Sequence, residues 1–137
     1  MGFSTSFRSA SHSVFLLHAH LVFVTKYRKK ILRKAHMDTL YLVMEDLCCS
    51  LGSSLLECDG EEDHIHLLVS YPPSLSISDL VNTLKGGASR RMRMLYPDLK
   101  KWFWKGHLWS PGYFACSCGG APLDIIKQYI KNQSTPS

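Results

Sequence analysis

The sequence predicts a single α+β domain in which an antiparallel sheet carries helices on one face. Three observations lead to this prediction. The chain has 137 residues, a length typical of one domain with one core. Hydrophobic residues make up 45% and charged residues 20% of it, which excludes disordered, fibrous and membrane classes. Apolar runs with the spacing of strands also alternate with runs that have the spacing of helices.

The first part of the chain predicts an arm, a strand and a helix. Residues 1–13 are rich in serine and predict a flexible N-terminal arm. Residues 14–25 are β-branched and aromatic, which is typical of a strand covered on both faces. Apolar side chains then recur every three or four residues between Leu40 and Leu51, and Gly52 follows as a stop. This spacing predicts an amphipathic helix.

The middle of the chain predicts a hairpin and a second helix. Residues 54–58 and 64–71 are short apolar runs on either side of an acidic turn that contains Gly60, as in a β-hairpin. Ser76, with Asp79 three residues later, predicts the start of a helix. An apolar stripe at helical spacing continues from there as far as Leu95.

The last part of the chain predicts one more strand and one more helix. Residues 113–118 form the strand, Gly119 and Gly120 a flexible joint, and residues 122–133 a helix with a narrow apolar stripe. The order is therefore strand, helix, strand, strand, helix, strand, helix. This order predicts a ferredoxin-like or RRM-like sandwich with an added C-terminal helix. We expect one domain over residues 14–133 and a tail over 134–137.

The positive charge of the chain is concentrated in two segments. The formal net charge is +5. Residues 26–34 hold six basic side chains and no acid, and residues 85–105 hold seven basic side chains and one acid, whereas five of the eleven acids lie in residues 57–63. This segregation favours a basic surface that binds a polyanion such as nucleic acid. The alternative is two solvated Lys and Arg surfaces.

The cysteines and the N-terminal sequence predict the cellular compartment of the protein. Five cysteines are an odd number, none is spaced Cys-x-x-Cys, and Cys48 and Cys49 are adjacent, so a disulfide framework is not expected. The first apolar run is interrupted by His18 and His20, which argues against a signal peptide or a membrane span. We expect a cytoplasmic protein with no membrane partner.

Two pairs of histidines have a spacing that suits metal binding. His64 and His66 lie in a predicted strand, where a spacing of two puts both imidazoles on one face. His18 and His20 have the same spacing in the first predicted strand. By spacing alone, either pair is also compatible with ordinary strand histidines.

A tyrosine and a glutamine on the last predicted helix add a second candidate feature. Tyr129 and Gln133 are four residues apart and therefore share one helical face. A tyrosine hydroxyl is a weak nucleophile that needs a Lewis acid to activate the phosphate it attacks or a base to take its proton. A pair of histidines completed by glutamine would make such a Lewis-acid site. The alternative is an amphipathic tyrosine at the edge of a helix.

Four blocks of the sequence resemble a known family. These are HLVFVTKYRKKIL (20–32), DHIHLLV (63–69), LKGGASR (84–90) and GGAPLDIIKQYIKNQ (119–133). In this order and at these distances they resemble the single-tyrosine HUH transposases of the smallest bacterial and archaeal insertion sequences. The resemblance covers nearly the whole chain, and His18 departs from it.

The resemblance implies a reaction and its residues. His64, His66 and Gln133 would be ligands of Mg²⁺ or Mn²⁺, and Tyr129 the nucleophile. Enzymes of this family cleave and rejoin single-stranded DNA through a 5′-phosphotyrosine and recognise hairpins near the ends of the element. Members of the family are dimers whose tyrosine helix can serve the partner's metal site. For this chain we expect active sites shared in trans.

Basic and aromatic side chains are candidates for contacts with DNA. Trp102, Phe103, Trp104 and Trp109 suit stacking on unpaired bases, and the alternative is a tryptophan cluster that anchors a loop on the core. The expected phosphate contacts are Lys26, Arg28, Lys29, Lys30, Lys85, Arg90, Arg91, Arg93, Lys100, Lys101 and Lys105, with Gly86 and Gly87 allowing close approach of the DNA backbone.

Two other functions fit parts of the sequence. In the first, the protein is an RRM-like nucleic-acid-binding module whose histidines and Tyr129 are structural. In the second, it is a zinc-dependent hydrolase that uses His64, His66, Cys116 and Cys118. A covalent adduct between the protein and DNA would distinguish the transposase from both.

Overall fold

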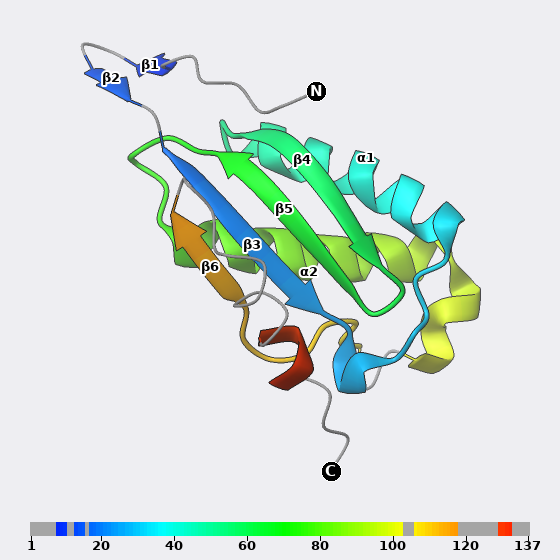
Figure 1. Cartoon of the computed structure of the whole chain (residues 1–137). Helices are drawn as coiled ribbons and strands as arrows, with labels where there is room; N and C mark the ends of the chain where they lie inside the picture. The colour runs from blue at the N-terminus through cyan, green and yellow to red at the C-terminus, as the bar shows by residue number, and fades with distance from the viewer. Residues whose placement is uncertain (1–7, 11–12, 16, 103–105, 118–128, 133–137) are drawn as a thin grey trace.

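A four-stranded antiparallel sheet forms the centre of the molecule (Figure 1). The structure is a computed structural model that describes residues 8–10, 13–15, 17–102, 106–117 and 129–132. The strands follow the order β4-β5-β3-β6, and two helices cover one face of the sheet. This arrangement confirms the predicted ferredoxin-like sandwich. The elements are β3 (His18–Val24), α1 (Lys34–Ser50), β4 (Ser54–Glu61), β5 (His64–Ser70), α2 (Ile77–Leu95) and β6 (Phe114–Ser117).

The core lies between the sheet and the two helices. Alternation along β3 and β5 sends Leu21 and Phe23, and likewise Ile65 and Leu67, toward α1 and α2, where all four are fully buried. The opposite face of the sheet carries Val22 and the histidines of both strands. Because Val22 is also fully buried, β3 is covered on both faces, as its continuous apolar sequence predicts.

The two helices begin with different caps. Ser76 accepts a hydrogen bond at Oγ from the backbone N–H of Asp79 at 3.0 Å, which confirms the predicted start of α2. α1 begins at Lys34, six residues before the apolar periodicity. At its first turn the backbone N–H of Arg33 donates to Nδ1 of His36 at 2.9 Å. A histidine at this position is not a usual capping residue, so the sequence did not reveal the early start.

The hairpin of β4 and β5 is longer than predicted. β4 continues to Glu61, and Gly60 lies inside it, opposite Ile65, rather than in the turn. A Cβ atom at Gly60 would lie 2.2 Å from the backbone oxygen of His64, so glycine allows the two strands to approach here. The turn itself consists of Glu62 and Asp63.

The N-terminal region differs from the prediction. The single strand expected over residues 14–25 is divided into β2 (Ser13–Phe15) and β3. β1 (Arg8–Ala10), inside the segment expected to be a flexible arm, pairs antiparallel with β2 in a separate two-stranded sheet. This small sheet projects from the beginning of β3 (Figure 1). The apolar sequence runs across the break without a polar residue or a glycine, so its pattern gave no sign of it.

Two short 3₁₀ helices and a loop complete the described part of the chain. η1 (Lys26–Arg28) follows β3, and η2 (Pro97–Trp102) follows α2. Trp109 forms an isolated bridge with Thr25 and leads into β6. Residues 129–132 are helical, as predicted, whereas the rest of the expected last helix and Gly119 and Gly120 lie outside the described residues. None of the described helices is long and apolar enough to span a membrane.

Gly60→Ala is expected to destabilise the protein by about 1–3 kcal/mol, because the added methyl group collides with the backbone of β5. Gly86→Ala is the matched control. Gly86 lies in α2 with nothing within 4 Å of its Cβ position, so alanine should stabilise the helix by about 0.5–1 kcal/mol. Urea denaturation of the two variants measures both effects, and equal stability of the two would contradict the strand contact described here.

Candidate functional site

His64 and His66 lie side by side on the face of the sheet opposite the two helices. They belong to β5 and alternate with Ile65, which points into the core. Their ring centroids are 6.5 Å apart, and the ring planes differ by 24°. His64 is buried and His66 half-buried. The structure therefore brings this predicted pair together on one surface.

Asp63 fixes the orientation of the first histidine. Its Oδ1 lies 2.9 Å from Nδ1 of His64, and its Oδ2 accepts a hydrogen bond from Nε of Arg28 at 2.9 Å. Burial by itself raises the pKa of the Asp63 carboxyl, but the hydrogen bonds from His64 and Arg28 outweigh it and hold the pKa below its ordinary value. Because an ionised carboxylate can only accept a hydrogen bond, Nδ1 of His64 is the donor, and Nε2 is the ring nitrogen that Asp63 leaves unengaged.

Burial also keeps the second histidine neutral. The pKa of His66 is lowered mainly by desolvation, with further contributions from His64 and His20, while the carboxylates of Asp59 and Glu57 act in the opposite direction. A metal ion binds imidazole in its neutral form, and the lowered pKa of His66 favours that form at neutral pH. A histidine that hydrogen-bonds a carboxylate through its other nitrogen is typical of metal sites.

The two histidines line a cavity of about 820 Å³, which we call the histidine cavity. Its walls come from four parts of the chain: β3, the hairpin end of β4 and β5, the segment around η1, and the C-terminal helical residues Ile130 and Lys131. A cavity of this size suits a nucleotide-sized group. The lining is mixed in charge, since it includes the cations Arg28 and Lys30 and the acidic residues Glu61, Glu62 and Asp63.

Tyr129 stands at the edge of this region. Its ring packs on Phe114 of β6 with centroids 5.6 Å apart, and the next residue, Ile130, lines the histidine cavity. Burial raises the pKa of Tyr129, so the hydroxyl is protonated at neutral pH. Gln133, the predicted third ligand, lies outside the described residues. Within the described ranges, no group of three His, Cys, Asp or Glu side chains is arranged to hold a metal ion.

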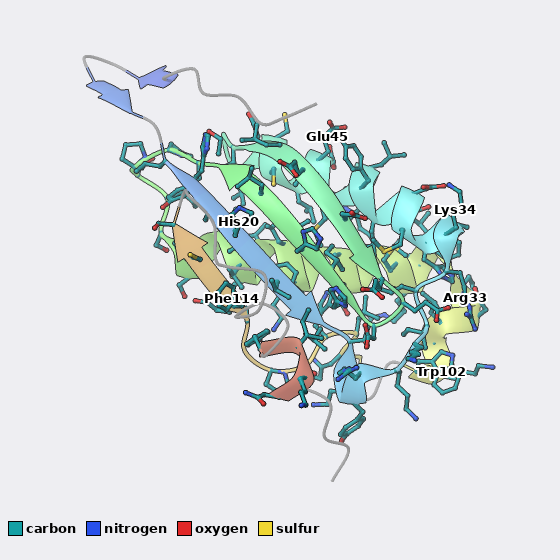
Figure 2. All side chains as sticks on the ribbon, viewed as in Figure 1. His20, Arg33, Lys34, Glu45, Trp102 and Phe114 are labelled. Carbon is teal, nitrogen blue, oxygen red and sulfur yellow. The ribbon has the colours of Figure 1, made fainter. Side chains whose placement is uncertain are left out.

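A third histidine that the sequence did not select also lines the cavity. This is His20 of β3. It lies two residues before Val22 and therefore on the same face of the sheet. Val22 is paired with His66 of β5 on one side and with Phe114 of β6 on the other. Figure 2 shows His20 and Phe114 on these neighbouring strands. His18, its partner in the spacing pattern, is instead buried at the far end of β3, opposite Ser70. His18 and His20 have the same spacing pattern in sequence, and only their positions along β3 in the register with β5 distinguish them.

The described cysteine of the proposed zinc site lies apart from the pair of histidines. Cys116 pairs in register with His20, so that β3 separates it from the strand that carries His64 and His66. Cys118 lies outside the described residues.

Four of the predicted DNA contacts gather in a second cavity of about 490 Å³, which we call the basic cavity. None of the described residues that line it is acidic. Lys85 donates through Nζ to the backbone oxygens of Ser110 at 2.8 Å and Gly112 at 2.6 Å. Its pKa is lowered by burial and by Lys26. An anion would stabilise these neighbouring charges. The four residues are Lys26, Lys85, Arg90 and Arg93.

The other predicted cations are distributed over the surface. Arg91 forms an ion pair with Asp46 of α1 at 2.5 Å, and the ammonium groups of Lys29 and Lys101 lie 5.5 Å and 5.2 Å from the ring centroid of Trp102. Arg28 and Lys30 line the histidine cavity, Lys100 is exposed in η2, and Lys105 lies outside the described residues. The predicted phosphate contacts that the structure describes are therefore divided between the two cavities and other parts of the surface.

The glycines and aromatic residues proposed to contact DNA also have separate positions. Gly86 lines the basic cavity, but Gly87 is buried against Leu47 of α1. Trp109 is buried and packs on Phe23 with centroids 5.8 Å apart, which fits the anchoring alternative. Trp102 remains partly exposed. Phe103 and Trp104 lie outside the described residues.

The sequence of this chain is similar to one protein family and to individual members of it. The family described as Transposase IS200 like matches residues 13–133. The ISDra2 transposase TnpA of Deinococcus radiodurans is 35% identical over 120 residues, which are 88% of this chain and 86% of that protein. The transposase for insertion sequence element IS200 of Salmonella typhimurium is 29% identical over 126 residues, covering 92% of this chain and 82% of that protein.

Two solved structures are similar in fold. The crystal structure of a Deinococcus radiodurans protein assigned as a transposase has a TM-score of 0.82 and 33% identity, and the match covers 92% of this chain and 97% of that one. The structure of the REP-associated tyrosine transposase bound to a REP hairpin has a TM-score of 0.55 at 10% identity, with 89% and 68% covered. The second likeness concerns the fold alone.

The lowered pKa of His66 predicts a loss of stability in mild acid. As the pH falls below 6.5, the ordinary value for histidine, the unfolded chain takes up a proton at His66 before the folded chain does, so the free energy of unfolding decreases. Denaturation with urea between pH 7 and pH 5, with a chelator present, should show a shallower decrease for His66→Gln. The exposed His107 provides the control, and an equal effect of His107→Gln would contradict the assignment.

Proposed function

Because this chain belongs to the IS200-like transposase family, we propose that it cleaves and rejoins single-stranded DNA at the ends of an insertion sequence through a 5′-phosphotyrosine at Tyr129. Family membership makes it a transposase, that is, an enzyme of DNA transposition. One feature of the histidine cavity supports this mechanism. The histidine pair of β5 and the C-terminal helical residues that follow Tyr129 line the same cavity.

The histidine cavity suits a divalent metal ion. His64 presents Nε2 because Asp63 occupies Nδ1, and His66 is neutral because it is half-buried. Together with Gln133 they would hold Mg²⁺ or Mn²⁺. When bound there, the ion supplies Lewis-acid polarisation of a phosphate. Two imidazoles are softer ligands than those Mg²⁺ usually takes, which favours Mn²⁺ in affinity.

Tyr129 supplies the nucleophile. Its oxygen attacks the scissile phosphorus, a new bond forms between phosphorus and Oη, and the bond to the 3′ oxygen breaks. The electron pair of the broken bond stays with the 3′ oxygen, which takes up a proton, while the phenolic proton is lost. The ester energy is retained, so another 3′-hydroxyl can reverse the step without a nucleotide cofactor. Phe114 holds the ring of Tyr129 from one side and thereby limits its positions.

The basic cavity is the proposed contact with the DNA phosphates. Lys26, Arg90 and Arg93 line it without a neighbouring carboxylate among the described residues. The fold relative bound to a REP hairpin supports a structured DNA ligand for this architecture. We therefore propose that hairpins near the element ends bind here, while the strand to be cut enters the histidine cavity.

Tyr129→Phe is expected to abolish cleavage, because the variant keeps the ring on Phe114 but lacks the attacking oxygen. The measurement is a denaturation-resistant adduct between the protein and single-stranded DNA that carries the ends of its element, in the presence of Mn²⁺. DNA affinity should remain unchanged. Tyr113→Phe, at an exposed tyrosine nearby, is the control and should form the adduct. An adduct with Tyr129→Phe would place the nucleophile elsewhere and contradict the proposed mechanism.

We also propose that the protein acts as a homodimer with active sites shared in trans. In the single chain, Ile130 and Lys131 line the cavity of their own chain, which gives the cis alternative. The described helical residues are joined to β6 by the stretch 118–128, which contains Gly119 and Gly120. Successive glycines allow many backbone paths, and this supports exchange of the helix between subunits.

Mixed dimers distinguish the two arrangements. Chains with Tyr129→Phe and chains with His64→Ala, carrying different tags, are co-expressed and the mixed dimer is isolated. Shared sites should restore about half of the wild-type adduct, since one site then has an intact tyrosine and an intact histidine pair. Sites within one chain leave the mixed dimer inactive, and a failure to obtain any mixed dimer would contradict the homodimer.

A further inference from the structure

The turn after β3 has a backbone conformation that is unusual for its residues. Tyr27 and Arg28 have φ values of 59° and 54°, in the left-handed region that side chains other than glycine rarely adopt. Two such residues in succession are a strained feature that the surrounding contacts must hold in place.

Backbone hydrogen bonds fix this turn to the hairpin of β4 and β5. Thr25, which is fully buried, donates its N–H to the backbone oxygen of Asp63 at 2.9 Å. The N–H of Arg28 donates back to the oxygen of Thr25 at 2.8 Å. The N–H of Leu32 donates to the oxygen of Glu62 at 2.9 Å. The strained turn and the residue before His64 are therefore one connected unit.

The result of this backbone path is that Arg28 reaches Asp63 from the side of the histidine cavity. Its Nε donates to Oδ2 at 2.9 Å, so that Oδ1 is left to face Nδ1 of His64. The side chain of Asp63 is only 10% exposed and that of Arg28 30% exposed. Both ends of the carboxylate are thus occupied by different partners.

We infer that Arg28 is a positioning residue for the histidine pair. By holding one oxygen of Asp63, it aims the other at His64, keeps the proton of that imidazole on Nδ1 and leaves the lone pair of Nε2 in the cavity. The role of Nε2 as a metal ligand rests on the proposed function. The placement of the proton on Nδ1 depends only on the hydrogen bond between Asp63 and His64. Arg28 therefore orients Asp63 and His64 within the protein, whether or not it also contacts DNA phosphates.

A neighbouring arginine provides a matched comparison. Arg33 pairs with Glu62, the other residue of the same turn, but both side chains are well exposed. It lies at the rim of the molecule (Figure 2), and its guanidinium donates to the carboxylate of Glu62 rather than to Asp63. An exposed pair of this kind contributes little, whereas the pair of Arg28 and Asp63 determines an orientation.

The experiment compares Arg28→Met with Arg33→Met in the metal-free protein. Long-range ¹H–¹⁵N NMR reads which imidazole nitrogen of His64 carries the proton. Wild type and Arg33→Met should show the proton on Nδ1. Arg28→Met should show a mixture of both tautomers, and its affinity for Mn²⁺, measured by calorimetry, should fall about tenfold. If Arg28→Met does not fold, Asp63→Asn replaces it, with the same expected loss of a single tautomer.

The outcomes separate the inference from the proposed function. A single Nδ1 tautomer and unchanged Mn²⁺ affinity in Arg28→Met would overturn the positioning role. If the tautomer changes as expected but the wild-type protein forms no adduct with DNA, the proposed reaction fails and the positioning role stands.

Discussion

The antiparallel pairing of β3 with β5 is the constraint on which the rest of the structure depends. These two central strands place Leu21 opposite Leu67 on the helix side and Val22 opposite His66 on the other side of the sheet. The same register that closes the core therefore selects the face on which the histidines stand. Because side chains alternate with a period of two, the hydrophobic requirement on one face fixes the chemistry of the other.

The sequence predicted those parts of the molecule in which one local pattern decides the structure. The apolar stripe and the Ser76 cap predicted α2, and the alternation of His64, Ile65 and His66 predicted a pair of imidazoles on one face. The break before β3 and the position of Gly60 inside β4 depend on which strands pair and where, and this is not written in any short window. Tyr129 was singled out with Gln133 by their spacing, but its role as the nucleophile is predicted only through the family resemblance, since a single amphipathic tyrosine carries no specific signal.

Residues whose role depends on tertiary contacts were hardest to predict. His20 and His18 look equivalent in sequence, yet one lines the cavity and the other is buried at the end of its strand. Arg28 and Arg91 look like surface cations, but each has a carboxylate partner far away in the sequence. The charge pattern along the sequence identified two basic segments. It did not show which of their side chains share a cavity, because that depends on how α2 packs against the loop before β6.

The connection between β4 and β5 has a consequence for the kinds of change that the protein can accommodate. Glu62 and Asp63 are the whole turn, and the strands on both sides are paired up to it. Substitutions there alter individual contacts. An insertion or deletion of one residue would instead have to be absorbed by a bulge, or it would slide β5 by one position, exchanging Ile65 with its histidine neighbours between core and cavity. At this turn the number of residues is therefore a stricter requirement for the fold than their identity, and engineered changes should preserve length first.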